Sequence, residues 1–358
     1  MASGRSFLTY ARALDPGSFA AVMATGVVSI DAIQHGMPWL AHALFVVNVV
    51  AYMGLCALSV LRVLRFRVSM IADFVAPLTS AGFLTFVAGT CVLAAQCLIV
   101  LDAPLVAGSL GLVGATAWVI LTYSFFVTMI TRPIKRGLAR SINGGWLVVV
   151  VATQSVAVVA ILLSASTLFT ASEPRSLMLF AGLCLYLIGA GFYLLIITLL
   201  VYRMIFLAMR ARDFTPPYWI NMGAIAITAL AGSLFALHAP NPGPLAAVIP
   251  FVKGFTLFFW ATATWWIPLL LLLEVWRHLS RQVPLRYEVA YWNIVFPIAM
   301  YTVGTHELAR ALDLDFLLAI PAVGVYISLL AWLIVATALL MHVMREGSDA
   351  GARRSRKA

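Results

Sequence analysis

The six histidines are the side chains of this chain best suited to bind a metal or a haem, but their placement does not favour either. They are His35, His42, His238, His278, His306 and His342. Each falls near the end of an apolar run or in a connecting loop, whereas a haem carried across a bilayer needs axial histidines at membrane depth. The segment HELAR at 306–310 begins like a zinc-protease helix, but Arg310 stands where the second histidine is needed. The sequence therefore predicts no metal site and no cofactor.

Other patterns of enzyme chemistry are also incomplete. The glycine-rich stretch GSLGLVG, 108–114, departs from GxGxxG and lies inside an apolar run rather than after a strand. No pair of carboxylates falls at depth within an apolar run, where acid–base chemistry would need it. The four cysteines have neither metal-ligand nor disulfide spacing and are typical of small buried hydrophobic residues: Cys56, Cys91, Cys97 and Cys184. These features argue against an enzyme.

The composition indicates an integral membrane protein. Of the 358 residues, 63% are hydrophobic and 10% are charged, whereas a soluble domain is about 45–50% apolar and about 25% charged. A spanning helix needs about 20 apolar residues because the hydrocarbon core is about 30 Å thick. The sequence predicts an all-α fold of ten such helices, over residues 17–34, 39–61, 72–96, 104–130, 144–165, 176–202, 217–237, 248–274, 287–307 and 316–343.

The connecting segments alternate in charge along the chain. Both termini and every second loop hold most of the 23 lysines and arginines, whereas acidic residues such as Asp31, Asp102 and Glu307 gather in the other loops. The positive-inside rule then puts both termini on the cytoplasmic side of the plasma membrane. The net charge of +10 is explained by topology, so nucleic acid is not expected as a partner.

The charge pattern also divides the chain into three parts. We expect a cytoplasmic N-terminus at 1–16, a ten-helix transmembrane domain at 17–343 and a basic disordered cytoplasmic tail at 344–358. The basic tail is suited to rest on anionic lipid.

The odd-numbered runs differ from the even ones in carrying helix breakers and small polar residues. The first, DPGSFAAVMATGVVSI, has polar or small residues where leucine or valine would insert more easily. Breakers are tolerated in membrane helices beside a water-filled cavity. We therefore expect five parallel hairpins, with the odd helices forming an inner pore ring and the even helices an outer ring. The alternative is that small residues only allow close helix packing. The predicted lining residues are Thr25, Gly26, Ser29, Thr153, Asn221 and Asn293.

Such a pore would have little fixed charge. Anions are stabilised by the N–H groups at the N-terminal ends of broken inner helices, and weak distributed binding suits conduction because a solute must also leave. Lys253, in IPFVKGFTLFFW, either attracts anions from outside or extends its amine to the membrane interface.

Three motifs resemble one family of membrane proteins, the TehA and slow-type anion channel superfamily, which also contains malate permeases and sulfite efflux pumps. VMATGVVS at 22–29 is similar to the M-x-T-G element in the first helix of the malate and sulfite branch, and departs from the glycine-rich first helix of the TehA branch. YWNIVFPIAM at 291–300 resembles the aromatic ninth-helix motif, and PPYWINMGAIAIT at 216–228 stands where the seventh helix starts. The resemblance covers about residues 12–343.

The resemblance implies the five-hairpin fold, commonly a homotrimer with one pore per subunit, and a phenylalanine on helix nine that occludes the pore. The matching position is Phe296, directly before Pro297. A proline at this point also disrupts a backbone hydrogen bond of the helix and redirects its neighbours. The alternative for Phe296 is ordinary helix packing.

The sequence thus predicts an anion transporter or channel, with a small anion and the lipid bilayer as its partners. C4-dicarboxylates such as malate are the first expected substrates, and sulfite, nitrate, chloride or tellurite-linked transport are the alternatives. A non-conducting membrane sensor or assembly subunit is the alternative from another class. It would need a soluble effector domain or a long structured tail.

Overall fold

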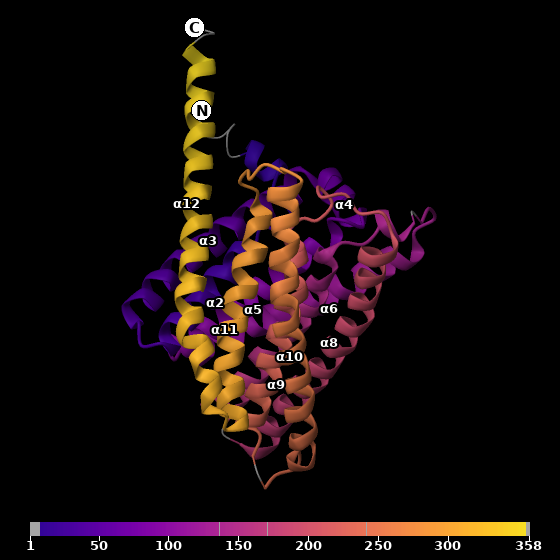
Figure 1. Cartoon of the computed structure of the whole chain (residues 1–358). Coiled ribbons are helices and arrows are strands. Elements are labelled where there is room, and N and C mark those ends of the chain that lie inside the picture. Colours follow the sequence, from indigo (N-terminus) through magenta and orange to yellow (C-terminus); the bar gives the residue numbers. More distant parts are fainter. Residues whose placement is uncertain (1–7, 136, 170, 241, 356–358) are drawn as a thin grey trace.

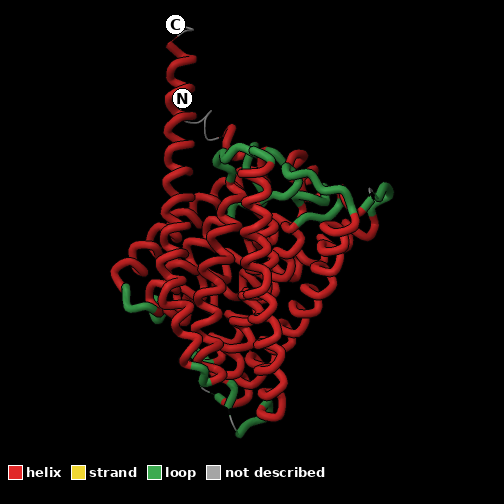
Figure 2. Tube along the Cα trace, in the orientation of Figure 1, coloured by secondary structure: helices red, strands yellow, loops and turns green. Residues whose placement is uncertain are grey.

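The chain folds into long helices joined by short loops and tight turns. The computed structural model describes residues 8–135, 137–169, 171–240 and 242–355, and these residues form no strand (Figure 2). The all-helical prediction is confirmed. A helix satisfies all of its backbone hydrogen bonds within one segment, which is the requirement that a lipid environment imposes on so apolar a chain.

Five helices form a closed inner ring in the described chain. They are α2 (Ala20–Gln34), α5 (Thr85–Ile99), α7 (Val148–Ser164), α9 (Ile220–His238) and α11 (Trp292–Leu312). Each contacts the next in this order, and α11 contacts α2. This ring places segments from both ends of the chain side by side.

Five longer helices surround the ring, and each packs on the inner helix that precedes it in the chain (Figure 1). They are α3 (Pro38–Arg65), α6 (Pro104–Thr131), α8 (Ser172–Phe206), α10 (Ile249–Val275) and α12 (Ala319–Ser355). In the most apolar stretch of each inner helix α5, α7 and α9, 72–94% of the residues are buried. In the most apolar stretch of each of the five peripheral helices, the buried share is 11–33%. An inner helix is apolar all round because it has neighbours on every side.

Eight helices of the described chain are long and apolar enough to cross a membrane: α3, α5, α6, α7, α8, α9, α10 and α12, some with an adjoining turn. The chain is therefore a multi-pass membrane protein. α2 is a shorter apolar helix of 15 residues, and α11 is not among the eight. That α2 and α11 also cross the membrane stays a prediction.

The third predicted helix, 72–96, is wrong in its first part. Residues Arg67–Val75 form a separate helix, α4, and the chain then turns before η1 (Ser80–Leu84) leads into α5. Pro77 is the cause, because a proline disfavours helical geometry in the residue before it. Ala76 is accordingly extended, with φ −76° and ψ 124°.

Four of the inner helices begin with a 3₁₀ turn. These turns are η1, η3 (Gly144–Leu147), η4 (Pro216–Trp219) and η7 (Val289–Tyr291), and each contacts the next. Gly144 allows η3 to approach η4 closely, since a Cβ there would lie 2.6 Å from the carbonyl carbon of Pro217. The chain of turns lies at the end of the bundle that also carries both chain termini (Figure 1). We call this the terminal end and the opposite end the distal end.

α12 extends well beyond the rest of the bundle at the terminal end (Figure 1). Its backbone is helical to Ser355, whereas the sequence predicts a disordered tail from residue 344. Residues 1–7 of the predicted N-terminal segment lie outside the described residues.

Candidate functional site

A single cavity is shared by all five inner helices. It encloses about 500 Å³ including its mouth, and every inner helix contributes at least three residues to its wall. On α2 and on α11 the wall residues are three and four positions apart, the spacing of one helix face: Val27, Ile30 and Gln34, then Met300, Val303 and Glu307.

The wall of this cavity is almost entirely apolar. Ser155, Gln34 and Glu307 are the polar members of its described lining, and no lysine or arginine is among them. Ser155 donates its hydroxyl proton to the carbonyl of Val151 at 2.8 Å, within its own helix. An ion inside the cavity would therefore be stabilised mainly by retained water and helix dipoles, because apolar walls do not replace its hydration.

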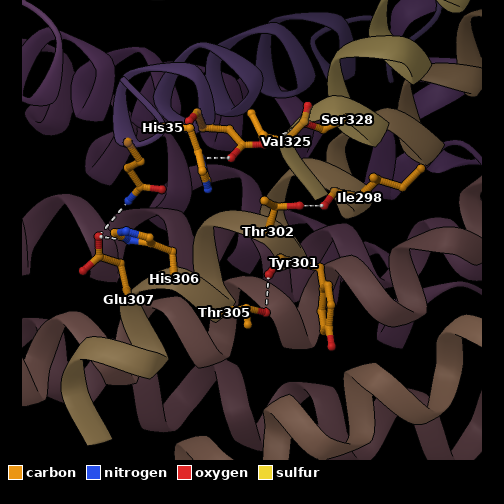
Figure 3. Close-up of polar contacts among 11 residues, drawn as sticks. His35, Ile298, Tyr301, Thr302, Thr305, His306, Glu307, Val325 and Ser328 are labelled. Carbon is orange, nitrogen blue, oxygen red and sulfur yellow. Dashed lines mark hydrogen bonds and ion pairs between the residues drawn. The ribbon is translucent and has the colours of Figure 1, made fainter. Parts of the chain in front are cut away.

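Two of the three polar wall residues, Gln34 on α2 and Glu307 on α11, lie together at the distal mouth. The Gln34 amide donates to Glu307 Oε1 at 2.7 Å. The guanidinium of Arg310 lies 2.9 Å from Glu307 Oε2. His306 Nδ1 lies 3.4 Å from Glu307 Oε1 (Figure 3). Glu307 is only 6% exposed, so a partly dehydrated carboxylate stands at the mouth of the cavity.

A second polar cluster adjoins the first and connects α2 to α12. Asp31 is fully buried and accepts a hydrogen bond from Ser328 Oγ at 2.6 Å. His35 Nδ1 lies 3.1 Å from Asp31 Oδ1, and its ring meets that of His306 edge-on at 5.8 Å (Figure 3). The hydrogen bond to Asp31 raises the pKa of His35, since the carboxylate favours the charged imidazolium.

The residues predicted in the first helix contact neighbouring helices. Thr25 Oγ1 accepts a hydrogen bond from the indole N–H of Trp332, on α12, at 2.9 Å. Ser29 Oγ donates to the carbonyl of Ala41, on α3, at 2.8 Å. A Cβ on Gly26 would lie 2.9 Å from Nδ2 of Asn48. None of the three is among the cavity-lining residues, so the structure does not bring them together at the cavity.

The predicted polar residues of α7 and α9 are also outside this lining. Thr153 Oγ1 accepts from the indole N–H of Trp118, on α6, at 2.9 Å. Asn221 is fully buried on α9, and neither of its side-chain polar atoms has a hydrogen-bond partner among the described residues. Thr305 Oγ1, on α11, likewise accepts a hydrogen bond from the indole N–H of Trp260, on α10, at 2.9 Å. Threonine hydroxyls of three inner helices thus bind tryptophans of the peripheral helices.

The predicted residues of α11 are placed differently. Asn293 and Phe296 precede Met300 by seven and four residues, so they continue the cavity-lining face of α11 towards the terminal end. Phe296 is 1% exposed. Pro297 packs against α9 at Gly223, where a Cβ would lie 2.7 Å from Pro297 Cγ.

Lys253 lies apart from these residues. It is half-buried on the peripheral helix α10 and is not among the cavity-lining residues. Sequence reasoning missed Gln34 and Glu307 as lining residues. The signal that could have found them is the spacing of three and four residues along one face of each inner helix. Gln34 and Glu307 are the last lining residues on that face of α2 and α11.

A metal site is not formed by the side chains in the described ranges. Among them, no group of three histidine, cysteine, aspartate or glutamate residues is arranged to hold a metal ion.

Comparison with known proteins finds similar sequences among membrane proteins and transporters. An uncharacterized membrane protein of Mycobacterium tuberculosis is 39% identical over 152 residues, which cover 42% of this chain and 76% of the relative. Two uncharacterized transporters of Methanocaldococcus jannaschii are 25% and 24% identical, over 81% and 83% of this chain and 82% and 85% of their own lengths.

The family comparison covers nearly the whole chain. The pattern of the voltage-dependent anion channel family matches residues 13–340, as the resemblance to the TehA and slow-type anion channels predicts. With this match and a cavity enclosed by five inner helices, the chain belongs to the voltage-dependent anion channel family.

Proposed function

We propose that this protein conducts small anions across a membrane through the cavity between its five inner helices. The observation that carries the proposal is the shared cavity, to which α2, α5, α7, α9 and α11 all contribute. A space enclosed by every inner helix is the natural path between the two ends of the bundle. Almost all of its wall is uncharged, which favours weak binding and therefore release.

Phe296 is proposed to close this path on the terminal side of the cavity. Its position one helical turn before Met300, on the same face of α11, supports this role. Its side chain is buried, and a buried ring on this face would fill the space along which the cavity could continue. Asn293 lies about one turn before Phe296 on α11, and we propose that it lines the path on the terminal side of the closure.

The substrates that the cavity favours are small and monovalent. Malate is the first expectation from the M-x-T-G element, but Thr25 and Gly26 of that element contact α12 and α3. The lining contains no cationic side chain that would hold two carboxylates. Because the cost of dehydrating an ion rises with its charge, we propose nitrate, chloride or hydrogen sulfite ahead of the malate dianion.

The orientation of the chain in the membrane and its oligomeric state are also proposals. The loops at the terminal end are the basic set, so we propose that this end faces the cytoplasm of a plasma membrane. The peripheral helices expose long apolar faces, which would contact lipid and, in the homotrimer expected of the family, the other subunits.

A flux assay tests the proposal. The purified full-length chain, reconstituted in liposomes, is tested with malate, succinate, sulfite, nitrate and chloride, with and without a proton gradient. We expect flux of the monovalent anions above that of protein-free liposomes. Folded, correctly inserted protein without flux of any of these anions would favour the non-conducting alternative.

A further inference from the structure

Glu307 is an unusual residue for the wall of an anion-conducting cavity. It is the one acidic member of the described lining, and it stands at the distal mouth. Gln34 and Arg310 hold its two oxygens at 2.7 and 2.9 Å, so the carboxylate is fixed in place rather than free to swing away. An anion that uses this mouth must pass a fixed negative charge.

Other charges around the mouth come from every neighbouring element. On α11 these are His306 and Arg310, and on α2 they are Asp31 and His35. His238, at the end of α9, interacts electrostatically with Glu307, Arg310 and Arg175 of α8. Asp313 and Asp315 follow α11 and are exposed.

The positive charge nearest to Glu307 belongs to Arg310, whose guanidinium lies 2.9 Å from its carboxylate. If Glu307 loses its charge, that of Arg310 stays at the mouth without its partner. The sign of the local potential at the mouth therefore depends on the charge of Glu307.

We propose that Glu307 is a fixed charge filter at the distal mouth, which discriminates anions by valence. The inference rests on the proposed function, since it concerns the same cavity. The physical basis is that the interaction of a fixed charge with a passing ion is proportional to the charge of that ion. The carboxylate therefore opposes a dianion twice as strongly as a monoanion.

The test compares two anions in liposomes that contain the full-length chain. Nitrate carries one charge and sulfate two throughout the range in which histidines titrate, about pH 5 to 8. In Glu307→Gln the side chain keeps its size but loses its charge, and one of its two acceptor oxygens is replaced by a donor NH2 group. At neutral pH we expect nitrate flux to rise about tenfold and sulfate flux about a hundredfold, because the interaction doubles with valence.

Two further variants separate charge from structure. Glu307→Asp keeps the charge, so its sulfate-to-nitrate ratio should stay at the wild-type value even if its stability falls. Glu173→Gln is the matched control, since Glu173 is an exposed residue in the first turn of α8, at the same end of the bundle. It should leave both fluxes unchanged.

An unchanged ratio in Glu307→Gln with normal nitrate flux, or an equal change in Glu173→Gln, would overturn the filter and leave the proposed function intact. A wild-type chain that conducts neither nitrate nor any other tested anion would overturn both.

Discussion

The indole N–H of Trp332, on the peripheral helix α12, donates a hydrogen bond to the hydroxyl of Thr25, on the inner helix α2, at 2.9 Å. Trp118 with Thr153 and Trp260 with Thr305 repeat this relationship between α6 and α7 and between α10 and α11. Polar residues that weaken an inner helix as a lipid-facing segment therefore attach the outer ring to the inner one. In a medium without water, an indole N–H needs such a partner.

Replacing Thr25 by valine removes the acceptor but keeps the shape of the side chain. We expect the protein to lose about 1 kcal/mol of stability, because the Trp332 N–H is left unpaired and cross-helix bonds in membranes have about that value. Thermal unfolding in detergent measures the loss.

A double-mutant cycle with Trp332→Phe is the control for this prediction. Once the indole N–H is gone, Thr25→Val should cost much less. Strictly additive losses would show that the hydrogen bond does not couple the two helices.

Phe296→Ala should increase anion flux through reconstituted protein. The substitution removes a buried ring from the face of α11 that lines the cavity, and so opens the path towards the terminal end. We expect at least a tenfold increase, measured by anion efflux from liposomes at equal protein incorporation.

Phe251→Ala is the matched control for Phe296. Phe251 is 56% exposed on the peripheral helix α10, so its loss should leave flux at the wild-type level. Well-folded Phe296→Ala protein with unchanged or lower flux would contradict the occluding role.

Gly144→Ala should destabilise the terminal end of the bundle. The new methyl would fall 2.6 Å from the carbonyl carbon of Pro217, and backbone atoms do not give way as a flexible side chain does. Overpacking of this kind costs about 1–3 kcal/mol, which a lower unfolding temperature would report. Gly54→Ala on α3 has nothing within 4 Å of the new Cβ and should be neutral, so equal losses in both would contradict this explanation.

The His35–Asp31 contact should make stability depend on pH. The contact raises the folded-state pKa of His35, so the stabilisation is fully present below the unfolded value of about 6.5 and is lost as pH rises through the raised folded value. Thermal unfolding between about pH 5 and 8 should show this gain on acidification.

His35→Gln should reduce that pH dependence, and His42→Gln should not. His42 is exposed on α3, and its Nδ1 lies 2.7 Å from the backbone carbonyl oxygen of Pro38 in the same helix. A pH profile that is identical in wild-type and His35→Gln protein would show that other groups determine it.

Much of the architecture could be predicted from the sequence because it follows from local and one-dimensional properties. Long apolar runs must be helical in lipid, and the difference between odd and even runs corresponds to the inner and peripheral helices of the structure. The sequence analysis did not predict a helix boundary at Pro77. The signal was present, because a residue before proline favours extended backbone geometry, and Ala76 adopts it.

The candidate site was harder to predict because a helix has several faces. Phe296 and Asn293 continue the face that lines the cavity, whereas Thr25 and Thr153 accept hydrogen bonds from peripheral tryptophans. A small hydroxyl suits a wet path and an indole partner equally well. Composition alone does not distinguish these two environments.

The sequence by itself determined the membrane class, the helices and the family, since hydropathy, charge alternation and short motifs are all properties of the linear chain. Only the tertiary structure decided which face of each inner helix meets the cavity, because that depends on neighbours far away in the chain. Gln34 and Glu307 are 273 residues apart in sequence, yet their side chains are 2.7 Å apart at the distal mouth. The closure of the inner ring between α2 and α11 brings them together.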